Sequence, residues 1–191
     1  MSLLDELKQS LGGDALQQIS QKLGTNQSST GTAIGAALPL LLGALARNAS
    51  TPGGAAALNT ALNDHDGSAL DNVAGVVNND NNGGADILSH VLGNKSPMVA
   101  NGIGQAAGID SSQASSLLAM LAPLVMGALG KAQRGGNLDA GSLATMLGQE
   151  HQNLNASGGA LGGLMGMLDS NHDGSIADDV MGMASKFFGK K

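Results

Sequence analysis

The chain has 191 residues, a formal net charge of −6 and no cysteine. The lack of cysteine excludes disulfides, thiolate metal ligands and thiol catalysis. The negative charge, without a basic patch or an aromatic stacking platform, excludes a nucleic-acid partner from our expectations.

Small aliphatic residues supply most of the apolar content, which is 42% of the chain, and aromatic residues supply only 1%. Ala and Leu are good helix formers, whereas strands draw on β-branched and aromatic residues, which form no sustained alternating run here. The 30 glycines, many of them in GG, NG or DG pairs, interrupt the apolar segments. We therefore expect an all-α, multihelical fold of short helices with many breaks.

Residues 1–13 predict an N-terminal amphipathic helix that ends at Gly12-Gly13. Four leucines recur in it at helical spacing: Leu3, Leu4, Leu7 and Leu11. This start has early acids and no apolar core of a signal peptide, so the expected location is cytoplasmic, with leaderless export left open. The longest apolar stretch, Thr32–Ala46, is shorter than the roughly 20 residues that a bilayer needs, so we expect no membrane span.

Two segments contain the same features at a constant offset. Gly24, Pro39 and Gly43 of the first correspond to Gly108, Pro123 and Gly127 of the second. In each segment a helix-ending glycine precedes an Asn or Asp cap and an apolar helix with a proline. We predict two related helical units, residues 14–77 and 85–156, joined by a polar linker over 78–84. Each proline either kinks its helix or begins a new one.

Three segments carry a family resemblance when they are taken in order: Asp86–Gly93, Gly108–Asp110 and Leu121–Gly127. This order resembles the bacterial family of unknown function DUF937, and its second half is similar to the related YidB-like proteins. The resemblance implies a multihelical fold with a short buried central helix. It implies no activity and no functional residues.

Residues 157–191 predict a Gly-rich helix, an acidic EF-hand-like loop and a C-terminal helix. An EF-hand loop surrounds calcium with oxygen ligands at fixed positions and has glycine at the sixth. Our candidate ligands are Asp169, Asn171, Asp173, Ser175, Asp178 and Asp179. The last position is Val180 rather than Glu, so Asp178 or Asp179 must close the site, which weakens it. The alternative is an Asx-rich turn that caps the last helix.

The four histidines are His65, His90, His151 and His172. We expect His90 to be a hydrogen-bonded or surface histidine on an apolar helix. No nucleophile–base pair, cofactor motif or phosphate loop stands out, so we do not expect an enzyme. A deep pocket lined by His90 and acidic residues would reopen that question.

These patterns predict a non-enzymatic helical structural or interaction protein that binds calcium weakly through its C-terminal loop. The alternative is a self-assembling scaffold without a metal, which the Gly-rich helical surface and the duplication suggest. The partner would be another protein or a second copy of the chain.

Overall fold

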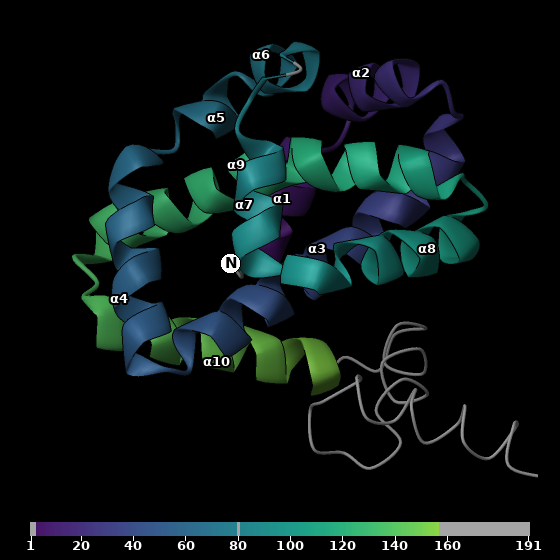
Figure 1. The fold of residues 1–191 in the computed structure, drawn as a ribbon. Helices are drawn as coiled ribbons and strands as arrows, with labels where there is room; N and C mark the ends of the chain where they lie inside the picture. The colour runs from purple at the N-terminus through teal and green to yellow at the C-terminus, as the bar shows by residue number, and fades with distance from the viewer. Residues whose placement is uncertain (1–2, 80, 157–191) are drawn as a thin grey trace, which may run out of the picture. The chain divides into compact units, whose positions relative to one another are not determined.

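The structure is a computed structural model that describes residues 3–79 and 81–156. Within these ranges it holds ten α-helices, two 3₁₀ helices and no strand (Figure 1). The predicted all-α, multihelical fold is therefore confirmed. Residues Met1–His151 form one compact unit. The second unit, Gln152–Lys191, lies almost wholly outside the described residues.

The helices follow one another through short connections. The first half of the chain holds α1 (Leu3–Ser10), α2 (Asp14–Leu23), α3 (Gln27–Ala49), α4 (Pro52–Ala61), the 3₁₀ helix η1 (Leu62–Asp64), α5 (Ser68–Asp71) and α6 (Val73–Asn78). The second half holds α7 (Gly84–Val91), the 3₁₀ helix η2 (Gly93–Lys95), α8 (Ser96–Ala107), α9 (Ser111–Gly136) and α10 (Ala140–Ala156).

The helices α2 and α8 end in the same way. Gly24 and Gly108 follow them in the left-handed conformation, with φ of 67° and 66°. Glycine adopts this conformation without steric cost, so it commonly ends helices. The cap of the next helix lies two residues later: Asn26 Oδ1 accepts from the N–H of Ser29 at 2.8 Å, and the N–H of Asp110 donates to the side chain of Gln113 at 2.9 Å. Both junctions predicted from the sequence are present.

The two helices that follow these junctions are longer than we expected. The helices α3 and α9 have 23 and 26 residues, and Pro39 and Pro123 lie inside them. Neither proline begins a helix. An internal proline costs about 3 kcal/mol because it removes a hydrogen bond and crowds the preceding turn. Burial of a long apolar helix offsets this cost, because tertiary packing supplies most of the stability of helices in proteins.

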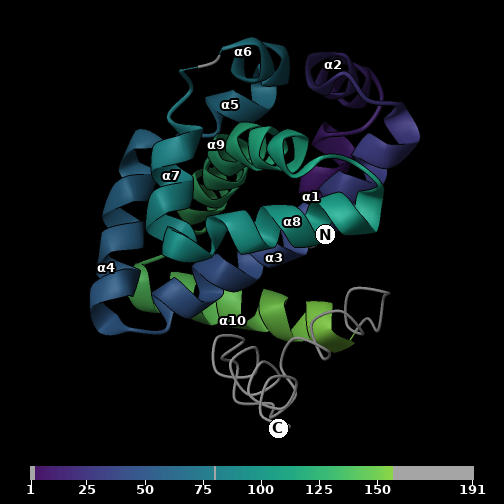
Figure 2. The same cartoon turned by 45° about the vertical axis from the view of Figure 1, so that its right-hand side comes forward.

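The helix α9 is the centre of the unit formed by residues 1–151. Every residue from Met120 to Gly130 is buried. A helix buried on all sides needs neighbours all round, and α1, α2, α3, α5, α6, α7, α8 and η1 each contact it (Figure 2). The central helix implied by the family resemblance is therefore present, but it is long. Helices that precede it from both halves of the described chain pack against it.

The helices α3 and α9 are long and apolar enough to cross a bilayer by length and composition, each with a mean hydropathy of 1.5 over its best window. The apolar stretch Thr32–Ala46, which we expected to be too short for a span, lies inside α3. The helix continues through polar residues on both sides of that stretch. In α3, 67% of this window is buried inside the protein, and in α9, 78% of it is buried. Such burial is typical of the core helices of water-soluble proteins.

The start of α7 lies directly on α9. Pro123 has no N–H, so the carbonyl of Ala119 lacks its usual helical donor. A Cβ on Gly84, the first residue of α7, would overlap that carbonyl oxygen. The N-terminus of a helix carries partial positive charge, which attracts the oxygen of a carbonyl that has no hydrogen-bond donor. Only glycine at position 84 lets the two backbones approach this closely.

A second close contact holds the segment after α4 on α9. A Cβ on Gly130 would overlap the backbone carbonyl oxygen of His65. One turn later, the Arg134 guanidinium donates to the carbonyls of His65 and Asn63 at 3.0 and 2.9 Å. The segment from η1 to His65 is thus attached to the C-terminal half of α9.

The polar segment 78–84 is held by its own side chains. The Asn82 amide donates to the carbonyl of Val76 at 3.1 Å and accepts from the N–H of Gly84 at 2.9 Å. Such side-chain bonds to nearby backbone replace regular structure in turns. Asn82 therefore orients the chain as it leaves α6 and enters α7.

The helix α10 packs through Leu143 and Leu147, which are both buried. Near its end, Glu150 accepts from the N–H of Leu4 at 3.1 Å and so satisfies a donor in the first turn of α1. The His151 ring lies over α3, where a Cβ on Gly43 would come within 3.2 Å of its Nδ1.

We predict that Gly130→Ala lowers the free energy of unfolding by about 1–3 kcal/mol, the usual range for overpacking. The reason is the overlap of the new Cβ with the His65 carbonyl. Gly102→Ala in α8 is the matched control, because nothing lies within 4 Å of its Cβ position. There alanine should stabilise the helix by about 0.5–1 kcal/mol. Urea unfolding measures both, and equal effects would contradict the close contact.

Candidate functional site

A cleft of about 400 Å³ lies between α4 and α7 and is also lined by residues of α3 and α9. Figure 1 labels these four helices. Aliphatic side chains from all four helices make most of its lining. Its main apolar residues are Leu45, Ala57, Leu58, Ile87, Val91 and Met126. Four polar side chains lie among them: Asn48, His65, Asp86 and His90.

The helix α7, which forms one wall, is held at both ends. Its start rests on α9 through Gly84, as described above. At its other end, the Asn48 amide of α3 donates to the carbonyl of Val91 at 3.1 Å. This bond also satisfies one of the last carbonyls of α7, which have no partner within the helix.

The helix α4, which forms the other wall, begins at a tight turn from α3. Thr51 caps it by accepting from the N–H of Gly54 at 3.1 Å. A Cβ on Gly54 would overlap the carbonyl oxygen of Asn48, so the turn closes only with glycine there. Two alanines of α4, Ala57 and Ala61, then line the cleft with small exposed side chains.

His90 and Asp86 lie one helical turn apart on α7. The Nδ1 of His90 is 2.8 Å from the carbonyl oxygen of Asp86, and a carbonyl only accepts, so Nδ1 carries the proton. The Nε2 of the neutral ring is then an acceptor. The Asp86 carboxylate is exposed and has no ion pair among residues 3–79 and 81–156. Both side chains therefore offer acceptors to the cleft.

His65 is the half-buried polar residue of the lining. Burial lowers the pKa of its imidazole, and the charges of Asp64 and Asp66 oppose that shift without cancelling it. The ring is therefore neutral near pH 7. It also lines a neighbouring pocket bounded by α5, α6 and Pro123, so it separates two cavities.

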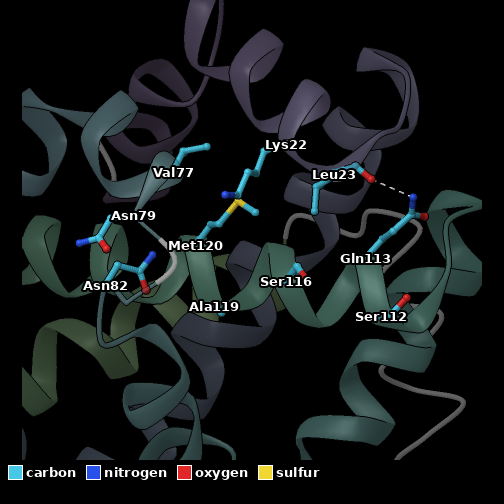
Figure 3. A pocket seen from close by; sticks show the side chains of 10 residues that line it. All are labelled: Lys22, Leu23, Val77, Asn79, Asn82, Ser112, Gln113, Ser116, Ala119 and Met120. Carbon is cyan, nitrogen blue, oxygen red and sulfur yellow. Dashed lines mark hydrogen bonds between the residues drawn. The ribbon is translucent and has the colours of Figure 1, made fainter.

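A more polar pocket of about 280 Å³ lies between α2, α6 and the first half of α9 (Figure 3). The Gln113 amide donates to the carbonyl of Leu23 at 2.9 Å, and Asn82 holds the turn before α7. In Figure 3, Lys22 and Met120 are drawn between Gln113 and Asn82. Gln113 and Asn82 hold the fold together, so we do not treat this pocket as the candidate site.

The six predicted calcium ligands (Asp169, Asn171, Asp173, Ser175, Asp178 and Asp179) lie outside the described residues, as does His172. In the described part of the chain, no group of three or more His, Asp or Glu residues is arranged to hold a metal. His90 is exposed and hydrogen-bonded, as we expected. Sequence reasoning missed Asp86, although its position four residues before His90 was the signal that could have found it.

The family DUF937, described as a bacterial protein of unknown function, matches residues 5–132. No curated protein and no solved structure matches the chain. Every residue that lines the cleft falls within the matched region, and the predicted calcium loop falls beyond it.

We predict that thermal stability falls as the pH is lowered from about 6.5. Burial lowers the pKa of His65 and His151 below the usual 6.5, and the charge of Arg47 adds to the effect at His151. The unfolded chain then binds more protons below that pH, so the stabilisation present above it is lost on acidification. Asp66 and Asp139 also have lowered pKa values, but their contribution to stability is lost only as the pH falls towards and below their usual pKa of 3.8.

Melting temperatures measured between pH 7.5 and 5 test this expectation. His65→Gln should make the profile less steep, because the amide does not titrate, and the slope that remains comes from His151. His90→Gln is the control, since the His90 ring is exposed. A native profile that is flat over this interval would contradict the buried, neutral histidines.

Proposed function

This chain belongs to the bacterial family of unknown function DUF937, and we propose that it is a non-enzymatic helical protein that binds a small apolar ligand in the cleft between α4 and α7. The observation that supports the proposal is the cleft itself. Sites for small molecules are typically concave, mostly apolar and about 300–1,000 Å³ in volume, with a few polar groups. The cleft has about 400 Å³, aliphatic walls and four polar side chains.

The way the walls are held also supports binding. Gly84 and Asn48 hold α7 at its two ends, and Gly130 holds the segment that follows α4. A cleft whose walls rest on a buried central helix keeps its form without a ligand, which lowers the entropic cost of binding.

Acid–base catalysis is the second candidate function, because the cleft contains His90 and acidic Asp86. Two observations favour binding over it. The proton-bearing Nδ1 of His90 is bonded to a backbone carbonyl rather than to a carboxylate. The described lining also contains no hydroxyl, thiol or amine that a histidine would activate.

We predict that a neutral apolar dye, N-phenyl-1-naphthylamine, becomes fluorescent when it binds the cleft. Ala57→Phe should weaken this binding on the order of tenfold, which is a loss of about 1.4 kcal/mol. The reason is that the larger ring fills the space beside exposed Ala57. Ala56→Phe is the matched control, since Ala56 is exposed on the same helix but does not line the cleft. Dye that stays dark, or responds equally to both variants, would refute the proposal.

We also propose calcium binding by the loop Asp169–Asp179, which would hold the last helix. The support is the sequence pattern of Asp169, Asn171, Asp173 and Gly174, since calcium prefers several oxygen ligands around a tight turn. The proposal is independent of the cleft. In this proposal, the protein combines a cleft for a ligand with a separate segment that depends on calcium.

Calcium should raise the melting temperature, because a ligand that binds only the folded state stabilises it by mass action. Asp173→Ala should remove the rise, whereas Asp71→Ala, outside the loop, should keep it. Thermal unfolding at increasing calcium concentration, with magnesium as the control ion, measures the effect. No shift at millimolar calcium would end this proposal.

A self-assembling scaffold is the alternative role. Its support is the Gly-rich helical surface and the duplication that we infer from the matched Gly24–Pro39 and Gly108–Pro123 segments. Light scattering at several protein concentrations distinguishes it, and a strictly monomeric protein would exclude it.

A further inference from the structure

Two polar side chains of the cleft, Asp86 and His90, offer acceptors to a ligand. The Asp86 carboxylate accepts only, and no described residue forms an ion pair with it. The Nε2 of a neutral His90 ring accepts because Nδ1 is already a donor. The Asn48 side-chain amide donates one N–H to the Val91 carbonyl, and its oxygen and its second N–H remain for a ligand.

Among the described residues that line the cleft, Asp86 is the one with a carboxylate. No Lys or Arg is among the described residues that line it. At the His65 end of the cleft, the Arg134 guanidinium is committed to the carbonyls of His65 and Asn63 and lies close to the charge of Asp66. Asp64 and Asp66 flank His65 at that end. The Asp86 carboxylate therefore gives the cleft a charge that is complementary to a positive group on a ligand.

We propose, as an extension of the proposed function on which it rests, that the ligand of the cleft is a cationic amphiphile: an apolar chain that ends in a protonated amine. The chain packs against Leu58, Ile87 and Met126, and the ammonium group donates to the Asp86 carboxylate. Hydrogen bonds to ionised groups are the stronger ones, and a partly apolar setting strengthens them further.

Other head groups fit less well for simple reasons. A carboxylate head would face Asp86 as a like charge. A neutral hydroxyl would use the apolar walls but leave the carboxylate without a counter-ion. The same apolar chain with different heads therefore separates the contribution of the walls from that of Asp86.

The test is displacement of N-phenyl-1-naphthylamine from the full chain at pH 8 by octylamine, 1-octanol and octanoate. Octylamine is protonated there, because alkylamines resemble lysine with a pKa near 10.4. We expect octylamine to compete on the order of fivefold more tightly than 1-octanol, as for a partly exposed ion pair, with octanoate weakest. Added salt should reduce the advantage of the amine.

Asp86→Asn should bring octylamine to the affinity of 1-octanol and leave 1-octanol unchanged. Asp71→Asn is the matched control, an exposed carboxylate outside the cleft lining that should change neither. Equal affinities of octylamine and 1-octanol in the native chain would overturn the inference and leave apolar binding standing. Tighter binding of octanoate would also overturn it. Failure of the dye to bind would remove the proposed function together with the inference.

Discussion

Pro123 removes one N–H from the middle of α9, and the carbonyl of Ala119 that would have accepted it faces the start of α7 instead. Gly84 makes this contact, because any side chain there would overlap the carbonyl oxygen. The proline that removes a hydrogen bond from α9 thus also leaves open the carbonyl on which the start of α7 rests. Since α7 forms one wall of the cleft, the candidate site depends on this contact.

The same central helix also positions the opposite side of the cleft. Gly130 brings the His65 carbonyl onto α9, and Arg134 bonds to the carbonyls beside it. The segment that carries His65 therefore has little freedom to move into the space between α4 and α7. The cleft persists because its walls are attached to α9 through their backbones, and side chains on the inner faces are left to meet a ligand.

Parts of this fold could be predicted because they depend on nearby residues. The helix ends at Gly24 and Gly108 follow from a left-handed conformation that favours glycine, and the starts near Asn26 and Asp110 follow from short-range capping. The lengths of α3 and α9 could not be predicted in this way. Pro39 and Pro123 are local signals for a break, and burial of the whole helix overrode them.

The sequence by itself determined the all-α class, the helix junctions and the membership in the DUF937 family, because each is expressed in short ordered patterns. Only the tertiary structure decided where the candidate site lies. Leu45, Leu58, Ile87 and Met126 are far apart in the chain and become neighbours only when α3, α4 and α7 pack with α9. Local propensities act over a few residues, whereas a cleft arises from the spaces that whole helices leave between them.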